Sequence, residues 1–180
     1  MVEGAGIPKG SLVNTSDIQG ILKALGERVP PASKLVLVGG SALALLGSQR
    51  PTIDIDFLGD DVKPEPLHQI IMQVARELKI HIEPVPLGRF VPLPASSDQR
   101  NIHIGQFGNL DIYVADPYSI ALTKLDRGLD TDLDDILFLI RHRYISLEEL
   151  ERFLLDALSR AGKYDFNPDV LAHLQVLKSR

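Results

Sequence analysis

The chain has 180 residues, of which 44% are hydrophobic and 24% are charged. This composition excludes an intrinsically disordered protein, and the length fits one domain or one domain with a small appendage. The 19 Lys and Arg and the 24 Asp and Glu give a net charge of −5, which argues against a broad basic surface that grips duplex DNA. The absence of cysteine excludes disulfides, thiolate catalysis and cysteine-bound zinc.

The sequence contains no segment that predicts a membrane span or a signal peptide. Its most apolar stretch, residues 35–46, is shorter than the ~20 apolar residues that cross a bilayer, and glycines interrupt it. Residues 1–16 lack the basic segment followed by an apolar segment that a secretory signal requires. We therefore expect a cytoplasmic protein that has no membrane partner.

Acidic residues gather in two short segments. The first contains no Lys or Arg, and the second contains Arg127 as its one basic residue. Clustered like charges cost free energy unless a positive group offsets them, so each segment is either a solvated face or a place that holds cations. The residues are Asp54, Asp56, Asp60 and Asp61 in the first segment and Asp126, Asp130, Asp132, Asp134 and Asp135 in the second.

The first 115 residues predict an α+β core. Residues 1–16 are Gly-rich and aperiodic, which predicts a flexible N-terminus, and Thr15 or Ser16 is expected to cap the first helix. The four prolines in residues 84–97 favour an irregular edge or loop there. Alternating or β-branched apolar residues predict strands at residues 34–38, 52–58, 79–85, 101–105 and 108–114. Helical spacing of apolar residues predicts helices at 17–29, 41–46 and 64–78.

The rest of the chain predicts helices only. Asp116 followed by Pro117 is a helix start, and Ser146 opens a capping box for a helix whose apolar stripe forms core and could also serve as a dimer face. The helices are expected at residues 116–127, 132–143, 146–160 and from 167 onward. We therefore expect a core domain at residues 17–115 and a C-terminal helical region at 116–180.

One group of residues in the predicted core has the residue types and spacing of a reactive site. Gly39-Gly40-Ser41 stands between a predicted strand and a predicted helix, where a Gly-Gly turn lets a bulky ligand approach the backbone and the helix start favours phosphate. Asp54 and Asp56 are two apart on a predicted strand, so they project side by side. Neighbouring carboxylates repel each other unless they are protonated or bridged by metal, so the pattern predicts hard cations beside a phosphate site.

The segment VGGSALALLG followed by RPTIDIDF resembles the signature of the minimal nucleotidyltransferases of the DNA polymerase β superfamily. It is most similar to bacterial nucleotidyltransferase-like proteins of the abortive-infection and toxin–antitoxin kind, in which Gly-Gly-Ser precedes Arg-x-Thr-x-Asp-apolar-Asp. That pattern falls here on Arg50, Thr52, Asp54 and Asp56. The resemblance implies a polymerase-β-like nucleotidyltransferase core, with a mixed sheet and flanking helices, followed by a helical segment.

The resemblance also implies a role for each matched residue. Asp54 and Asp56 would bind two Mg²⁺ or Mn²⁺ ions, and a later strand would supply a third metal-binding carboxylate that helps to activate the attacking hydroxyl. Asp111 is the best match for this third carboxylate, and Glu83 is the alternative. The implied nucleotide-binding residues are Gly39, Gly40, Ser41, Arg50, Thr52, Lys124 and Arg127.

The match is looser in the helical region. Lys124 and Arg127 with Asp132 and Asp135 resemble the family's Lys, Arg and Asp-x-x-Asp pattern, but Thr131 stands where these relatives often have a basic residue. Taken without the resemblance, Lys124 and Arg127 form the polar face of an amphipathic helix, and the acids are favoured by a helix dipole. Ordinary surface positions are expected for the two strand histidines, His81 and His103.

The predicted function is Mg²⁺-dependent transfer of a nucleoside monophosphate from an NTP to an acceptor hydroxyl, with release of pyrophosphate. The acceptor stays open between tRNA, a protein and a small molecule, and the scattered arginines give RNA little support. The alternative is a weakly catalytic or non-catalytic binding module of the same fold. Such a module would be one component of a toxin–antitoxin pair, with a cognate toxin or antitoxin or a second copy of the chain as its partner. The Gly-Gly-Ser turn disfavours a third possibility, a metal-dependent phosphohydrolase.

Overall fold

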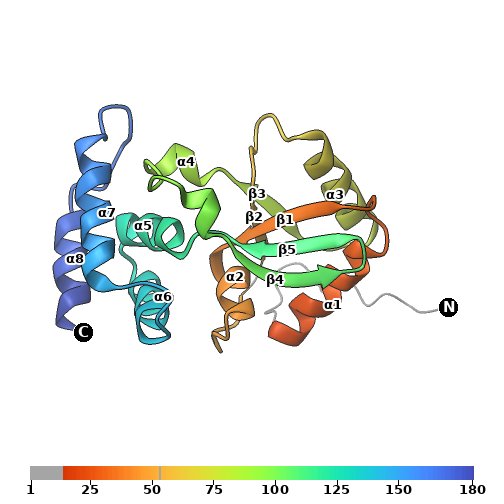
Figure 1. Ribbon diagram of the computed structural model, residues 1–180, viewed down its shortest axis with the longest axis horizontal. Coiled ribbons are helices and arrows are strands. Elements are labelled where there is room, and N and C mark those ends of the chain that lie inside the picture. Colours follow the sequence, from red (N-terminus) through yellow and green to blue (C-terminus); the bar gives the residue numbers. More distant parts are fainter. Residues whose placement is uncertain (1–13, 53) are drawn as a thin grey trace. The chain divides into compact units, whose positions relative to one another are not determined.

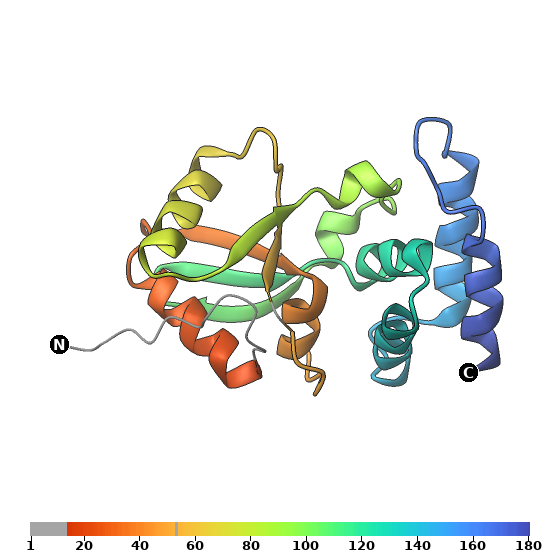
Figure 2. The same cartoon turned by 180° about the vertical axis from the view of Figure 1, so that it is seen from behind.

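The computed structural model describes residues 14–52 and 54–180, which form two compact units (Figures 1 and 2). The first unit contains the described residues up to Pro86 together with Ile102–Val114. The second contains Leu87–Asn101 and Ala115–Arg180. The longer segment of the helical unit begins at Ala115, close to the domain boundary expected near Asp116. The unit also includes Leu87–Asn101, which lies within the range expected for the core domain.

A five-stranded mixed sheet forms the centre of the first unit, in the order β3-β2-β1-β5-β4. The central strand β1 runs parallel to β5 and antiparallel to β2, while β2 and β3 are parallel and β4 and β5 are antiparallel. This arrangement confirms the predicted mixed sheet. The strands are β1 (Ser33–Val38), β2 (Ile55–Leu58), β3 (Ile82–Val85), β4 (Ile102–Phe107) and β5 (Leu110–Val114).

Alternation along the strands separates an apolar face of the sheet from a polar one. Helix α1 packs on β4 and β5, and α3 packs on β3. The buried face includes Phe57, Leu35 and Ile112, and burying each such side chain contributes about 1.5–3 kcal/mol to folding. The helices of this unit are α1 (Thr15–Gly26), α2 (Gly39–Leu45) and α3 (Pro66–Glu77). The polar face carries the strand carboxylates that the sequence analysis selected.

The cap of α1 differs from the prediction. Asn14, not Thr15 or Ser16, is the N-cap: its side chain accepts a hydrogen bond from the backbone N–H of Asp17 at 3.0 Å. The Asp17 carboxylate accepts one from the backbone N–H of Asn14 at 3.0 Å. This reciprocal capping box needs an acid three residues after the cap, and Asp17 stands at that spacing from Asn14 and not from Thr15 or Ser16.

The second unit is helical. Residues 84–97, expected to be irregular, contain the short helix α4 (Leu87–Phe90), and a 3₁₀ helix η1 (Ser97–Arg100) follows. Two predicted helix starts are confirmed: Asp116 accepts from the N–H of Tyr118 at 3.2 Å, and Ser146 accepts from the N–H of Glu149 at 3.2 Å. The longer helices are α5 (Pro117–Arg127), α6 (Asp130–Arg141), α7 (Leu147–Ser159) and α8 (Val170–Ser179).

The end of α5 is a close contact with α8. Gly128 ends the helix with a φ of 70°, and a Cβ there would lie 2.2 Å from the His173 ring. The Nδ1 atom of His173 lies 2.8 Å from the carbonyl oxygen of Leu125. Glycine is therefore needed at this position both for its backbone conformation and for the approach of α8.

Within residues 14–52 and 54–180, no helix has the length and apolar character needed to cross a membrane.

Candidate functional site

The Gly39-Gly40 turn joins β1 to α2 and packs against two predicted site residues. Gly39 has a φ of 66°, and a Cβ on it would lie 2.8 Å from Oδ2 of Asp56. A Cβ on Gly40 would lie 2.6 Å from Oγ1 of Thr52. The register of the sheet explains this approach, because Val38 at the end of β1 lies opposite Asp56 on β2. The structure thus brings both glycines, Thr52 and Asp56 together.

Replacing Gly39 by Ala tests this packing. The change forces an L-residue into the left-handed region and places a methyl group against the Asp56 carboxylate. We expect a loss of about 1–3 kcal/mol of stability, measured as a lower midpoint of urea unfolding.

Gly20→Ala is the matched control for this change. Gly20 lies inside α1 with open space around its Cα, so the same added methyl group should stabilise the protein by about 0.5–1 kcal/mol. Equal midpoints for the two variants would contradict the role assigned to Gly39.

The Asp-x-Asp segment lies beside β3. In the parallel pair of β2 and β3, Ile55 lies opposite Ile82 and Asp56 opposite Glu83. The Nε2 atom of His81 lies 3.2 Å from Oε1 of Glu83, and its Nδ1 lies 2.7 Å from Oδ1 of Asp54, although Nδ1 is not aligned for a hydrogen bond. An imidazole thus stands between two carboxylates on neighbouring strands.

The role of His81 was missed in the sequence, where it is expected to be an ordinary surface histidine. A detectable signal was present: residues 79–83 alternate so that His81 and Glu83 share one face, as Asp54 and Asp56 do on the preceding strand. If these two alternating segments lie side by side in the sheet, the pattern predicts one cluster of three carboxylates and an imidazole, formed by Asp54, Asp56, Glu83 and His81.

Asp111 does not join this cluster. It lies opposite Lys34 at the start of β1, whereas Asp56 lies opposite Val38 at its end, a separation of about 13 Å along the strand. Its Oδ1 atom is 2.6 Å from Nε2 of His103 instead. Burial, together with the charge and hydrogen bonding of Asp111, raises the pKa of the neighbouring Tyr113. Of the two predicted third carboxylates, Glu83 therefore lies beside Asp56 and Asp111 does not.

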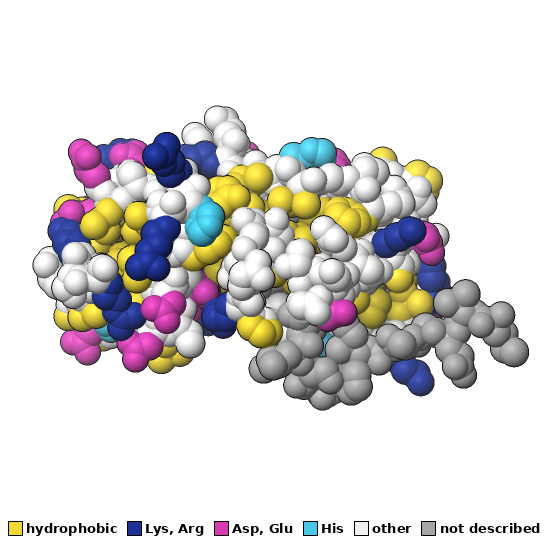
Figure 3. All heavy atoms as spheres, turned by 90° about the horizontal axis from the view of Figure 1, so that it is seen from below, with side chains coloured by type: hydrophobic (Ala, Val, Ile, Leu, Met, Phe, Trp, Pro, Cys, Tyr) yellow, Lys and Arg dark blue, Asp and Glu magenta, His cyan; other side chains and the backbone are white. Residues whose placement is uncertain are grey.

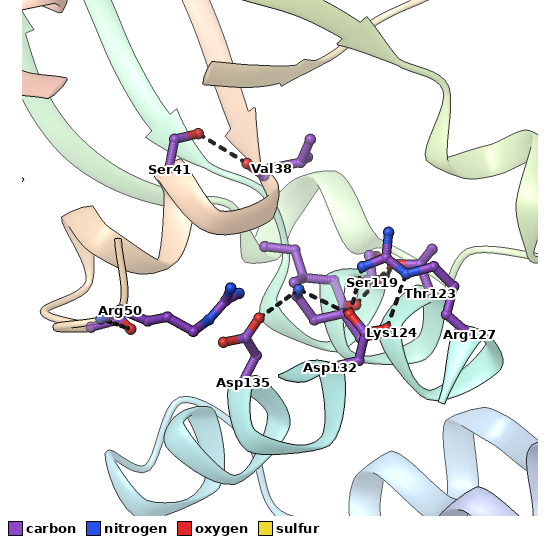
Figure 4. A network of polar contacts seen from close by, with 11 residues as sticks. Val38, Ser41, Arg50, Ser119, Thr123, Lys124, Arg127, Asp132 and Asp135 are labelled. Atoms are coloured by element: carbon purple, nitrogen blue, oxygen red, sulfur yellow. Dashed lines mark hydrogen bonds and ion pairs between the residues drawn. The ribbon is translucent and has the colours of Figure 1, made fainter. Parts of the chain in front are cut away.

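Ser41 is fully buried, and its hydroxyl donates a hydrogen bond to the carbonyl oxygen of Val38 at 3.1 Å (Figure 4). The Thr52 hydroxyl donates to the carbonyl oxygen of Asp54 at 3.3 Å, and the backbone N–H of Arg50 donates to the Ser48 hydroxyl at 3.3 Å. In this conformation the Ser41 side chain stabilises the turn. Its predicted contact with phosphate stays a prediction, as does that of Arg50.

The predicted pattern of the helical region forms an ion-pair network between α5 and α6 (Figure 4). The Lys124 ammonium lies 2.7 Å from Oδ2 of Asp135 and 3.5 Å from Oδ1 of Asp132, and all three side chains are at most 6% exposed. Arg127, which is 63% exposed, donates through Nε to Asp132 at 3.1 Å. Lys124 and Arg127 thus share a helix face as expected, and their contacts with phosphate stay a prediction.

The acids at the start of α6 do not form a simple solvated cluster. Asp130 and Asp134 are exposed and pair with Arg180, as a surface cluster would. Asp132 and Asp135 are 2% and 3% exposed, so neither belongs to a solvated cluster, although Asp132 does lie in the first turn of α6, where the helix dipole favours an acid. Buried carboxylates require a partner charge, and Lys124 supplies it.

A family profile described as "Nucleotidyltransferase of unknown function (DUF6036)" matches residues 16–177. The chain belongs to this nucleotidyltransferase family. The match extends over both compact units and confirms the resemblance to nucleotidyltransferases inferred from the Gly-Gly-Ser and Asp-x-Asp motifs, while the toxin–antitoxin kind stays a prediction. The search of curated proteins and the search of solved structures found no match.

The predicted site would have to accommodate divalent metal. Among the described residues, no three His, Asp or Glu side chains already stand in position to hold one ion. Mg²⁺, however, usually binds one or two carboxylates and completes its shell with water and substrate phosphates. Asp54 and Asp56 offer two carboxylates, and Asp56 packs against the Gly39-Gly40 turn, so the pair fits such a nucleotide-completed site.

Proposed function

We propose that this member of the nucleotidyltransferase family transfers a nucleoside monophosphate from an NTP to an acceptor hydroxyl in a reaction that requires Mg²⁺ or Mn²⁺. One observation carries the proposal: the Gly39-Gly40 turn packs directly against the Asp56 carboxylate. The start of α2, where free backbone N–H groups favour phosphate, and an oxygen ligand for a cation thereby lie together.

The reaction forms a bond from the acceptor oxygen to the α-phosphorus and breaks the bond to the bridging oxygen of the β-phosphate, so that pyrophosphate leaves. Asp54 and Asp56 would hold the divalent ions, which supply neutralising charge for the triphosphate when they are bound. The two glycines let Asp56 and Thr52 pack closely against the backbone at the start of α2, where the triphosphate would bind.

Glu83 is the group that we assign to accept the proton of the attacking hydroxyl. Its side chain is 57% exposed, and the β2–β3 register places it opposite Asp56. His81 contacts both Glu83 and Asp54, so it orients the base relative to the metal-binding pair. A base held in this way next to the reacting centre accelerates the transfer by positioning as well as by proton removal.

Labelled nucleotides test the proposed reaction. The full chain is incubated with each NTP, labelled at either the α- or the γ-phosphorus, together with Mg²⁺ and total tRNA, cell protein or a small-molecule extract. We expect the α-label and not the γ-label to appear in a product, and EDTA to abolish the transfer. Transfer of the γ-label would instead identify a kinase-type activity and overturn the proposal.

A second candidate is a non-catalytic module of the same fold that binds nucleotide or a partner, such as the other component of a toxin–antitoxin pair. The observation that favours it is the distance of Asp111 from Asp56 along the sheet, which leaves Glu83 as the proposed third carboxylate. NTP binding in equilibrium dialysis without transfer of either label would support this module and contradict the enzyme.

A further inference from the structure

The helical unit contains two adjoining hollows that none of the predicted site residues line. The first has a volume of about 610 Å³ and the second about 460 Å³, and Tyr118 and Ser146 line both. The backbone N–H of Ser146 donates to the Tyr118 hydroxyl at 3.1 Å, so these two shared residues are held together. We call the two hollows together the Tyr118 groove.

Aromatic rings and guanidinium groups alternate along the first hollow. Tyr118 and Phe153 pack edge to face with their centroids 4.9 Å apart. The guanidinium carbons of Arg100 and Arg152 lie 5.1 and 4.8 Å from the Phe153 ring centre. Nucleobases of single strands stack on such rings and on guanidinium planes, with little dependence on base type.

The charged residues that line the groove are mainly basic. Arg100, Arg143 and Arg152 come from three separate segments of the chain, and Glu149 is the acid among the lining residues. Arg152 donates hydrogen bonds to Glu149 and, together with the charge of Arg100, holds the pKa of this carboxyl below its usual value. The three arginines outnumber this single lining carboxylate, so the groove has positive charge available for phosphate contacts.

Hydrogen bonds to Asp116 and to the backbone of Ala95 fix the side chain of Arg100. Its Nε and Nη2 atoms donate to Oδ1 and Oδ2 of Asp116 at 3.1 and 2.9 Å, and its Nη1 donates to the carbonyl oxygen of Ala95 at 2.8 Å. Asp116 is 1% exposed, so Arg100 and Asp116 form a fixed, bidentate ion pair beneath the groove. A side chain restrained in this way loses little entropy when a ligand binds.

The backbone at the rim of the groove is also unusual. Ser96 and Arg143 have φ values of 58° and 61°, and they are two of the four non-Gly residues with positive φ in the described part of the chain. Each lines one of the two hollows. Left-handed backbone at a non-Gly residue costs free energy and gathers at ligand sites.

We infer that the Tyr118 groove binds single-stranded nucleic acid, with bases on the Tyr118–Phe153 pair and phosphates on Arg100, Arg143 and Arg152. The alternation of rings and cations fits a strand better than an acidic peptide, which offers no bases to stack. Duplex is disfavoured, because acidic side chains interrupt the basic ones on the face drawn in Figure 3 and the net charge is −5. The strand would be the acceptor of the proposed transfer, and this role alone rests on the proposed function.

Fluorescence anisotropy tests the binding, without NTP or divalent metal. The probes are a single-stranded RNA and a single-stranded DNA of about twelve nucleotides, the corresponding duplex, and a poly-glutamate peptide of equal length. We expect the single strands to bind at least tenfold more tightly than the duplex or the peptide. Preference for RNA or for DNA identifies the natural strand. Preference for the peptide or the duplex overturns the inference.

Two charge-matched double variants locate the binding. Arg143→Gln/Arg152→Gln should weaken single-strand binding at least tenfold and reduce the slope of log K against log salt by about 1.4. Arg141→Gln/Lys163→Gln removes the same charge from exposed positions outside the groove and should change the affinity less than twofold. Equal losses in both variants would show non-specific attraction and overturn the inference.

The stacking contact and the transfer reaction are tested separately. Phe153→Leu keeps the charge and should weaken single-strand binding about tenfold, whereas unchanged affinity would overturn the stacking contact. Tight binding by a protein that transfers no label supports the groove while the proposed function fails. Label transfer to a small molecule by a protein that binds no strand supports the proposed function and overturns the inference about the groove.

Discussion

The variant Asp54→Asn/Asp56→Asn is expected to lose about a thousandfold or more in the rate of α-label transfer. The substitution retains the shape of both side chains, so the packing of residue 56 against Gly39 is preserved. It removes two negative charges from the pair that would hold the divalent ions, and such ions contribute several kcal/mol of transition-state stabilisation. The measurement is the initial rate at saturating NTP and Mg²⁺, together with the unfolding midpoint.

Two single variants separate the alternatives for the third carboxylate. Glu83→Gln should reduce the rate about a hundredfold, because the base opposite Asp56 is lost. Asp111→Asn should keep the rate within about threefold, since its carboxylate lies about 13 Å away along β1 and contacts His103. The reverse order of effects would show that Asp111 serves as the third carboxylate after all.

Replacement of Lys124 by Met is expected to destabilise the helical unit by about 3–5 kcal/mol. The change removes the ammonium that lies 2.7 Å from Asp135 and leaves a carboxylate that is 4% exposed without this counter-charge. Removing one member of a buried ion pair is costly because the remaining charge stays out of water and has lost its attraction to that member. Urea unfolding followed by circular dichroism measures the loss.

A compensating variant distinguishes this cause from a simple packing defect. Lys124→Met/Asp135→Leu removes both charges and should recover at least half of the lost stability, while Asp132 keeps its contact with Arg127. The exposed pair of Arg152 and Glu149 offers a matched surface comparison, where Arg152→Gln should cost less than about 1 kcal/mol. If the double variant were as unstable as Lys124→Met alone, the buried charge would not be the cause.

Local sequence rules predicted the elements of the fold better than their ends. Asp116 and Ser146 were recognised as helix caps because capping depends on residues two or three positions apart. The cap of α1 was assigned one or two residues too late, since Asn14, Thr15 and Ser16 are all good capping residues and the acid at the third following position selects among them. The short helix α4 was missed because prolines surround it.

The sequence by itself determined the motif that places this chain among the nucleotidyltransferases. A Gly-Gly turn between a strand and a helix, followed by Asp54 and Asp56 on one strand face, is a local pattern that predicts a phosphate site beside cations, and its resemblance to the nucleotidyltransferase signature implies the reaction. Only the tertiary structure showed that Glu83 lies beside Asp56 and that Asp111 does not, because the pairing and register of strands determine which distant carboxylates lie close together. The tertiary structure also showed that Lys124 is buried against Asp132 and Asp135 of α6, whereas the sequence pattern predicts that Lys124 lies on the polar face of its helix.

The same distinction applies to the basic residues. In the sequence the arginines are scattered and give little support for a path that binds nucleic acid. In the folded helical unit, Arg100, Arg143 and Arg152 line the Tyr118 groove. Their gathering depends on how α5 packs against α6, α7 and η1, and this packing is determined mainly by apolar contacts, which do not depend on charge.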